Sequence, residues 1–428
     1  MEYFHFGVQD GAIHCEDVPL SRVIERTGTP TYVYSRDTIE RHFHQLRDAF
    51  GGIETLICYS VKANANLAVL QTLRELGAGF DVVSGGELFR ALQAGGHPKK
   101  IVFAGVGKTA DDIAFALDSR ILMFNVESEP ELRAIGRIAA ARGQIADIAL
   151  RVNPDVDPKT HRYITTGKAE SKFGIDLESA ARLAAQIPEI GGVRMVGVHA
   201  HIGSQITDTT PYTEAMTKAL AFADACRDLG NPIEWINMGG GFGIYYKGRE
   251  ALPAQDYGDV ILPMLLDSGY RLVIEPGRFI TGNAGALITR VLYVKESGRK
   301  RFVICDAAMN DLIRPSLYSA HHEVWPVQCD HEMGSEAAAA VSTPADVVGP
   351  ICETGDFFAL DRMLPPVKEG DLLAVFSAGA YGMVMASNYN GRPRPAEVLV
   401  SGDLFDVVRT RETWDDLIRG ERKVARWD

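Results

Sequence analysis

Residues 54–84, ETLICYSVKANANLAVLQTLRELGAGFDVVS, contain two apolar runs with a helical pattern between them. The runs at 54–60 and 79–84 are short and almost continuously apolar, as parallel strands buried on both faces are. Between them leucine recurs at every third position from Leu67 to Leu76, before a glycine that is typical of a helix end. The stretch therefore predicts a strand–helix–strand unit, with these leucines as the buried stripe of the helix.

The same alternation continues along the chain as far as residue 277. Six further apolar runs follow, at 100–105, 121–126, 147–153, 193–203, 233–241 and 270–277. Eight strand-then-helix units over about 250 residues are the size and pattern of a (β/α)8 barrel. A doubly wound open sheet is the alternative, although it needs fewer strands. We therefore expect an α/β fold with a TIM-like (β/α)8 barrel over residues 31–277.

Beyond residue 280 the pattern changes to alternating or continuous strand-like runs, with glycine and proline between them and few helical segments. This pattern predicts a second, β-rich domain with a sandwich-like or barrel-like sheet. The N-terminal segment includes HFGVQDGAIHC (5–15), which predicts a hairpin with its turn at QDG. We assign residues 1–30 and 278–428 to the second domain, because the barrel rhythm begins later.

The composition argues against several classes of protein. The 428 residues carry a formal net charge of −12, which disfavours a nucleic-acid-binding or anionic-membrane surface. The six cysteines are scattered without a C-x-x-C pair, so neither a disulfide framework nor a zinc site is indicated. The N-terminal segment lacks the basic and apolar regions of a signal peptide, and no apolar run approaches the length of a membrane span. We expect a reduced, cytoplasmic protein.

Polar and glycine residues collect at the carboxyl ends of the predicted barrel strands, where barrel enzymes carry their active sites. They are Lys62 after the first strand, Asp81 and Ser84 on the second, His199, His201 and Ser204 after the sixth, Asn237 and Gly239–Gly241 after the seventh, and Glu275–Arg278 after the eighth. The strand middles stay apolar, so these side chains mark one candidate site.

The glycine run GGGFG (239–243) is a candidate phosphate site. Glycine lets backbone N–H groups approach an anion closely, and the loops after the seventh and eighth strands are the usual phosphate site of this fold. A flexible turn is the alternative interpretation. The segment AGVGKT (104–109) resembles a P-loop, but Val102 stands where that motif requires glycine. We assign the segment to a loop between a strand and a helix.

Lys62 and Glu275 form the second part of the candidate site. A lysine at a barrel mouth beside a phosphate site indicates a Schiff base with pyridoxal phosphate, whose pyridine nitrogen needs an acidic partner. Glu275 could supply that carboxylate, and a Lys62–Glu275 ion pair at the barrel rim is the alternative. His199 and His201 could bind a metal ion with Asp81, stack on a planar cofactor or pack in the core. We expect no metal site.

Nine segments spread from residue 59 to residue 382 carry a resemblance to a known family. They are YSVKANANLAVL (59–70), GFDVVSGGEL (79–88), SKFGI (171–175), HAHIGSQ (199–205), GGGFGI (239–244), EPGR (275–278), RPSLY (314–318), GPICETGD (349–356) and GAYG (379–382). In this order they resemble the diaminopimelate decarboxylases, of the alanine-racemase-like, fold-type III class of pyridoxal-phosphate enzymes. Departures are minor: Thr354 stands where serine is common, and Ala200 lies at a variable position.

The resemblance implies a role for each matching residue. Lys62 corresponds to the lysine that holds pyridoxal 5′-phosphate as a Schiff base, His201 to the imidazole stacked on the ring, and Glu275 to the carboxylate on the pyridine nitrogen. The implied cofactor contacts are Lys62, Asp81, His201, Ser204, Gly240, Gly241, Glu275, Gly277, Arg278 and Tyr381. The implied substrate contacts are Arg278, Arg314, Tyr318, Glu353 and Tyr381. The implied catalytic residues are Lys62, His201 and Cys352, the last as a proton donor after carbon dioxide leaves.

The resemblance also implies the reaction, which is decarboxylation of meso-2,6-diaminopimelate to L-lysine and carbon dioxide, the last step of lysine biosynthesis by the diaminopimelate route. Arg314 would bind the carboxylate at the unreactive end of the substrate, since a guanidinium fork suits a carboxylate. A surface or capping arginine is the alternative, and an inert buried thiol is the alternative for Cys352. In the family Cys352 and Glu353 complete the site of a second subunit, which implies a homodimer.

Other functions compete with this one. A related decarboxylase of another amino acid, of the carboxynorspermidine or basic amino-acid type, would favour an acidic residue in place of Arg314. A catalytically inactive, pyridoxal-phosphate-binding homologue would have lost Lys62 or Cys352. A cofactor-free Schiff-base aldolase would leave the glycine run and Glu275 without a function. We expect a small-molecule substrate, no nucleic-acid or membrane partner, and a lid formed by the polar segment 154–174.

Overall fold

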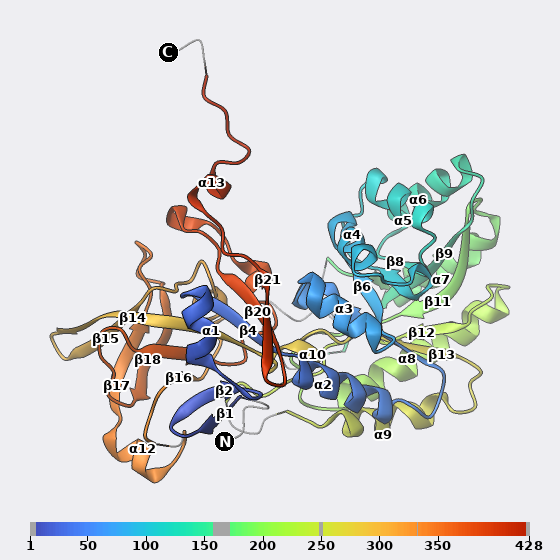
Figure 1. The fold of residues 1–428 in the computed structure, drawn as a ribbon. Coiled ribbons are helices and arrows are strands. Elements are labelled where there is room, and N and C mark those ends of the chain that lie inside the picture. Colours follow the sequence, from blue (N-terminus) through green and yellow to red (C-terminus); the bar gives the residue numbers. More distant parts are fainter. Residues whose placement is uncertain (1–5, 157–171, 248–250, 332, 425–428) are drawn as a thin grey trace. The chain divides into compact units, whose positions relative to one another are not determined.

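The computed structural model describes residues 6–156, 172–247, 251–331 and 333–424 (Figure 1). The chain divides into two compact units. One unit consists of Ile39–Thr281, and the other combines Met1–Thr38 with Gly282–Asp428. Most of the predicted lid, 154–174, lies outside the described residues.

The unit Ile39–Thr281 contains a closed barrel of parallel strands. Its strands, in spatial order, are β5 (Thr55–Ser60), β6 (Gly79–Val82), β7 (Ile101–Phe103), β8 (Met123–Val126), β9 (Ala146–Asn153), β11 (Val193–His199), β12 (Trp235–Asn237) and β13 (Arg271–Ile274). The barrel closes because β13 pairs in parallel with β5 as well as with β12. A doubly wound sheet would leave these edges open, so the predicted (β/α)8 barrel is confirmed. The short strand β10 (Ile175–Asp176) adds to β9.

Helices follow the strands along the chain and lie around the outside of the barrel (Figure 1). They are α2 (Arg36–Ala49), α3 (Leu67–Glu75), α4 (Gly85–Gln93), α5 (Ala110–Ser119), α6 (Glu129–Ala141), α7 (Leu177–Gln186), α8 (Thr210–Asp228), α9 (Ala254–Leu265) and α10 (Arg278–Thr281). Side chains of asparagine, serine, threonine or aspartate cap the first turns of α3 to α7 by accepting a backbone N–H. These caps satisfy donors that a helix leaves without partners, and they fix where each helix begins.

Two local predictions in this unit have different outcomes. The segment 104–109 is a loop between β7 and α5, as predicted, and its last residue, Thr109, caps α5. The predicted leucine stripe of α3 is wrong at its start, because Leu67 is 45% exposed. The buried face of α3 instead uses Val69, Leu70 and Leu73, since a spacing of three drifts around a helix that turns every 3.6 residues.

The barrel interior is filled by apolar side chains from its strands. One buried cluster takes a residue from each of seven barrel strands: Cys58, Val102, Met123, Ala149, Val196, Trp235 and Val273. Layers of this kind make the middle of such a barrel a packed core rather than a channel. Polar chemistry is therefore confined to the barrel ends.

The other unit is β-rich, as predicted. Its main sheet has the order β18 (Phe357–Leu364), β17 (Thr343–Val348), β15 (Lys300–Cys305), β14 (Gly285–Ser297), β4 (Thr31–Ser35), β20 (Ala396–Ser401) and β21 (Leu404–Arg409). Strand β19 (Leu372–Val375) pairs with β14 and with β16 (Val324–Pro326). Short helices α1 (Leu20–Thr27), α11 (Arg314–Tyr318), α12 (Glu336–Val341) and α13 (Trp414–Leu417) complete the unit.

Strand β4 lies outside the barrel, although the predicted barrel domain begins at residue 31. The strand pairs with β14 and β20 in the β-rich sheet. Its composition, TYVYS, suits either sheet, so only the pairing partners decide where it belongs. At the other boundary, α10 remains in the barrel unit.

The predicted N-terminal hairpin is confirmed. Strands β1 (Phe6–Gln9) and β2 (Ala12–Cys15) pair antiparallel, with Gln9 opposite Ala12. Asp10 and Gly11 form the two-residue turn with φ of 50° and 75°, as the favoured hairpin turns require. A short strand, β3 (Val18–Pro19), pairs with β2. In the part of the chain that the structure describes, no helix has the length and apolar character needed to cross a membrane.

Close packing around Gly192 gives a test of the barrel's outer layer. A Cβ at Gly192 would lie 2.2 Å from the carbonyl oxygen of Gly136 in α6, whereas a Cβ at Gly143 would meet open space. Both glycines have positive φ, so either alanine substitution costs roughly 1–2 kcal/mol of backbone strain. Gly192→Ala should cost a further 1–3 kcal/mol or so by overpacking. Denaturant midpoints should therefore fall more for Gly192→Ala than for Gly143→Ala, and equal midpoints would contradict the close approach.

Candidate active site

Lys62 lies at the mouth of the barrel, beside a buried carboxylate. It belongs to a single turn of 3-10 helix (Val61–Ala63) directly after β5. Its Nζ donates to Oδ2 of Asp81 at 2.6 Å, and Ser60 Oγ donates to the same oxygen at 2.7 Å. The parallel pairing of β5 with β6 sets Ser60 opposite Asp81 and so fixes this contact. The ion pair found for Lys62 is thus with Asp81, whereas the alternative in the sequence analysis is a pair with Glu275.

Asp81 is fully buried, so its environment raises its affinity for a proton. Burial raises the pKa of Asp81, and the nearby Glu275 raises it further. Lys62 and Ser60 lower the pKa of Asp81 without cancelling these effects. Among the described residues, Oδ1 of Asp81 has no hydrogen-bond partner. Asp81 is thus a proton acceptor within reach of the Lys62 amine.

Glu275 follows β13 and is held as a carboxylate by two amides. Its Oε1 accepts from Nδ2 of Asn125 at 3.0 Å and from Nδ2 of Asn237 at 2.6 Å. Nε2 of His199 lies 3.5 Å from the other oxygen, Oε2. Burial opposes ionisation, but His199 and Lys62 outweigh it and lower the pKa of Glu275 below its ordinary value. An amide N–H can only donate, so both asparagines also require the acceptor form of this oxygen.

His201 is neutral and supports the glycine turn. The N–H of Gly240 donates to Nδ1 of His201 at 3.2 Å, so that nitrogen carries no proton. Desolvation lowers the pKa of His201 well below its ordinary value, and the cations Arg151 and Lys62 add to this effect. The contact fixes the orientation of the His201 ring, and an uncharged ring held in this way can stack on a planar group.

The glycine run after β12 forms a turn packed against the end of β13. A Cβ at Gly240 would lie 2.1 Å from the carbonyl oxygen of Glu275, and Gly241 has a φ of 96°. The N–H of Gly239 donates to Oδ1 of Asn237 at 2.9 Å. Glycine is thus required here by close packing and by backbone conformation, in addition to any approach of an anion.

Arg278 joins two loops at the same mouth. Its Nη2 donates to Ser204 Oγ at 3.0 Å, and its Nη1 donates to Tyr246 Oη at 2.6 Å. The preceding residue, Gly277, packs so tightly that a Cβ would lie 2.9 Å from Cβ of Ala63. The structure therefore brings the predicted barrel residues Lys62, Asp81, His201, Ser204, Gly240, Gly241, Glu275, Gly277 and Arg278 to the carboxyl ends of the strands.

The remaining predicted residues belong to the β-rich unit. Arg314 begins α11, is only 6% exposed, and holds its guanidinium 5.8 Å from the Tyr318 ring centre. The interpretation of Arg314 as a surface arginine is therefore wrong. Its Nε donates to Nε2 of the buried His322 at 3.3 Å. An arginine held so firmly is suited to bind an anion in a fixed orientation.

Cys352, Glu353 and Tyr381 also lie in the β-rich unit. Cys352 is exposed, so the interpretation as a buried, inert thiol is wrong. Its N–H donates to Oδ1 of Asn390 at 2.9 Å. Glu353 hydrogen-bonds Tyr389 and so raises the pKa of that phenol. Tyr381 has a φ of 56°, a conformation that non-glycine residues seldom adopt and that often marks a functional turn.

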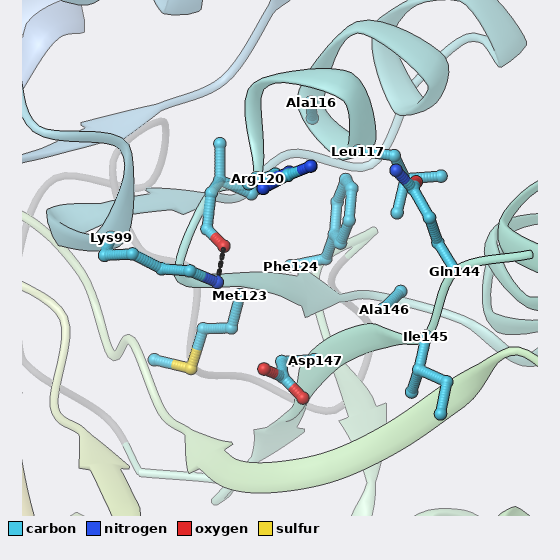
Figure 2. A pocket seen from close by; sticks show the side chains of 11 residues that line it. Lys99, Ala116, Leu117, Arg120, Met123, Phe124, Gln144, Ile145, Ala146 and Asp147 are labelled. Carbon is cyan, nitrogen blue, oxygen red and sulfur yellow. Dashed lines mark hydrogen bonds between the residues drawn. The ribbon is translucent and has the colours of Figure 1, made fainter. Parts of the chain in front are cut away.

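A separate hollow of about 300 Å³ lies at the amino ends of β8 and β9 (Figure 2). Its lining includes Lys99, Arg120, Met123 and Asp147, and Lys99 Nζ donates to the carbonyl oxygen of Ile121 at 3.3 Å. The predicted site residues do not line it. In barrels of this kind the amino ends of the strands serve stability rather than chemistry, so we do not assign the active site to this hollow.

Several residues of the site were not found from the sequence. Asn125 is the single polar residue in the run ILMFNV, and that isolation is the signal that could have identified it. Ser60 ends its apolar run in a similar way. Tyr246 and His322 carry no such signal, because their partners Arg278 and Arg314 are reached only through the folded structure.

The chain is similar to known proteins over nearly its whole length. The family described as pyridoxal-dependent decarboxylase, pyridoxal binding domain, matches residues 36–282. Diaminopimelate decarboxylase of Aquifex aeolicus is 48% identical over 411 residues, which are 96% of this chain and 96% of that protein. Diaminopimelate decarboxylase of Pseudomonas aeruginosa is 50% identical over 416 residues, which are 97% of this chain and 98% of that protein.

Solved structures agree with these relatives. Diaminopimelate decarboxylase from Helicobacter pylori, complexed with L-lysine, superposes with a TM-score of 0.88 at 42% identity, covering 94% of this chain and 98% of that one. The enzyme from M. jannaschii, in co-complex with L-lysine, superposes with a TM-score of 0.92 at 38% identity, covering 98% of each chain. Together with the lysine and carboxylates at the barrel mouth, these similarities show that the chain belongs to the diaminopimelate decarboxylase family of pyridoxal-dependent decarboxylases.

Proposed function

We propose that this chain is a pyridoxal 5′-phosphate-dependent carboxy-lyase that converts meso-2,6-diaminopimelate to L-lysine and carbon dioxide. The observation that carries the proposal is the amine of Lys62, hydrogen-bonded to the buried carboxyl of Asp81, at the barrel mouth that also holds the buried Glu275. The pKa of Asp81 is raised and that of Glu275 is lowered. Full-length relatives that are diaminopimelate decarboxylases support the choice of substrate.

The residues at the barrel mouth fit the cofactor. Lys62 would hold it through its amine, Glu275 would accept a hydrogen bond from its ring nitrogen, and neutral His201 would lie against its ring. The proposed phosphate contacts are Ser204, Gly240, Gly241 and Gly277, with Asp81, Arg278 and Tyr381 as further cofactor neighbours. When bound, pyridoxal phosphate supplies a protonated ring that accepts the electron pair left behind by carbon dioxide.

Lys62 must lose a proton before its amine can act as a nucleophile. Oδ2 of Asp81 lies 2.6 Å from Lys62 Nζ, which is a hydrogen-bond distance suited to proton transfer. Because the pKa of Asp81 is raised, the carboxylate can take that proton and return it later. Asp81 therefore holds the proton while the amine reacts.

Glu275 has the opposite task, which is to remain ionised. Oε1 accepts from the two amides, and Oε2, which faces His199 Nε2 at 3.5 Å, is the oxygen that we propose to hold the proton on the cofactor's ring nitrogen. A carboxylate with a lowered pKa keeps that proton on its partner rather than on itself. We therefore assign proton acceptance from Lys62 to Asp81, and stabilisation of the proton on the ring nitrogen to Glu275.

In the β-rich unit we propose that Arg314 binds the carboxylate at the unreactive end of the substrate, with Tyr318 beside it. A basic amino-acid substrate would place a cation against this arginine, which disfavours the related decarboxylases of ornithine or lysine. We also propose a homodimer, in which exposed Cys352 and Glu353 complete the site of the partner chain, with Cys352 as the proton donor. Cytoplasmic localisation stays a prediction.

Substrate preference tests the proposed reaction directly. Carbon dioxide release from meso-diaminopimelate, L-lysine and L-ornithine should be measured side by side with the protein loaded with pyridoxal phosphate. Only diaminopimelate should react at an appreciable rate, because it alone offers a second carboxylate to Arg314. Faster release from lysine or ornithine would assign the chain to a different decarboxylase.

The cofactor linkage is testable by chemical reduction. Borohydride treatment should join pyridoxal phosphate permanently to Lys62 Nζ, because this amine lies at the barrel mouth beside a proton acceptor. Peptide mapping by mass spectrometry locates the modified residue, and Lys62→Ala should lose the modification. Attachment to a different lysine of the unaltered protein would refute the assignment.

The role of Arg314 predicts a selective loss of substrate binding. Arg314→Ala removes charge-assisted hydrogen bonds worth about 1.5–3 kcal/mol, so KM for diaminopimelate should rise roughly ten- to a hundredfold. Cofactor content, read from absorbance, should remain unchanged. Arg299→Ala, at an exposed position, is the matched control. An unchanged KM in Arg314→Ala would remove the proposed distal-carboxylate contact.

A further inference from the structure

We propose that His322 is a positioning residue for Arg314, and that it sets the affinity for the far carboxylate of the substrate. The inference rests on the role of Arg314 given under the proposed function. His322 is fully buried, and Arg314 is 6% exposed. Their contact, from Arg314 Nε to His322 Nε2 at 3.3 Å, lies entirely within the β-rich unit.

The fold fixes His322 through the pairing of two short strands. Strand β16 begins at Val324 and pairs antiparallel with β19, with Val324 opposite Val375. The next pair along continues this ladder, because Phe376 N–H donates to the carbonyl oxygen of Glu323 at 2.9 Å. His322 Nδ1 then lies 2.8 Å from the carbonyl oxygen of Phe376. The imidazole is therefore positioned by the β16–β19 pairing and by its bond to Phe376, in addition to its contact with Arg314.

The two contacts of the ring determine its protonation. A carbonyl oxygen can only accept, so the nitrogen facing Phe376, Nδ1, carries the hydrogen. The Nε–H of Arg314 can only donate, so Nε2 of His322 offers a lone pair. Both contacts are satisfied together by one species, the neutral imidazole protonated at Nδ1. His322 thus acts as a fixed acceptor beside a permanent cation.

This acceptor controls the direction of the guanidinium. The group is planar, so fixing its Nε–H also fixes the plane in which the two Nη groups lie. Tyr318 provides a second constraint, with its ring centre 5.8 Å from the guanidinium carbon. Pre-organisation of this kind raises affinity, because the side chain loses little freedom when an anion binds. Without His322 the buried Nε–H would lack its acceptor.

The backbone around His322 has supports that do not involve the imidazole. Arg362 Nη1, from β18, donates to the carbonyl oxygen of His322 at 3.0 Å and to Glu323 Oε1 at 3.1 Å. The adjacent His321 contacts Glu323 and Arg362 instead, and its side chain is 27% exposed. Removing the His322 ring therefore removes the Arg314 contact while the strand remains anchored, and His321 is the matched control position.

The experiment compares His322→Leu, His322→Gln and His321→Leu in the holoenzyme. His322→Leu should raise KM for meso-diaminopimelate about tenfold and change kcat much less, because the lost hydrogen bond acts on binding. Inhibition by L-lysine should weaken by the same factor, since the product keeps the far carboxylate. His322→Gln offers an acceptor oxygen near the position of Nε2 and should restore most of the affinity. His321→Leu should leave both constants within about twofold.

A double variant separates this inference from the proposed function. If His322 acts through Arg314, Arg314→Ala with His322→Leu should have the same KM as Arg314→Ala alone. If the two substitutions instead raise KM additively in the double variant, the positioning role is overturned. It is also overturned if His322→Gln melts at the normal temperature yet has a KM as high as that of His322→Leu. No effect of Arg314→Ala would instead refute the distal-carboxylate contact itself. If His322→Leu does not fold, His322→Gln is compared with the wild type and with Arg314→Ala instead. A KM for His322→Gln close to that of the wild type supports the inference, and a KM close to that of Arg314→Ala overturns it.

Discussion

Closure of the barrel between β13 and β5 is the constraint on which the candidate site depends. The last strand pairs with the first, and the contact continues beyond the strands themselves. Ser60 N–H donates to the carbonyl oxygen of Pro276 at 3.0 Å, and Ser60 Oγ lies 3.0 Å from the carbonyl oxygen of Glu275. Lys62 and Glu275, at opposite ends of the barrel sequence, therefore reach one mouth. Without closure, the amine and the carboxylate would belong to separate edges of an open sheet.

Electrostatics at this mouth follows from burying two carboxylates near one amine. Like charges in a poorly solvated space cannot both ionise freely, so the environment separates their protonation. Burial and the nearby Glu275 raise the pKa of Asp81 despite the ammonium and the hydroxyl beside it, whereas His199 and Lys62 outweigh burial and lower the pKa of Glu275. These partners follow from the strand order, since β5 lies beside β6 while His199 ends β11, two strands away from β13. The barrel thereby turns similar side chains into groups with different chemistry.

The sequence predicted the barrel because eight apolar runs and their polar ends follow from local composition. Lys62, Asp81 and Glu275 stand out in the same way, as charged residues at the ends of apolar strands. The place of β4 could not be predicted, because TYVYS suits either sheet and its partners, β14 and β20, are remote in the chain. Asn125 was missed since one polar residue in an apolar strand has no periodic signal. The hydrogen bond of Gly240 to His201 depends on a turn geometry that composition does not encode.

Asn237 is a position at the barrel mouth where few other residues could replace the one present. Its Nδ2 donates to Glu275 while its Oδ1 accepts from Gly239, so a single amide serves a side chain and the backbone at once. An aspartate of the same shape would set one carboxylate against another, and a leucine would leave a buried donor and a buried acceptor unsatisfied. Deamidation of Asn237 to aspartate would create the same pair of opposed carboxylates beside Glu275. The fully buried position of Asn237 limits the access of water to that reaction.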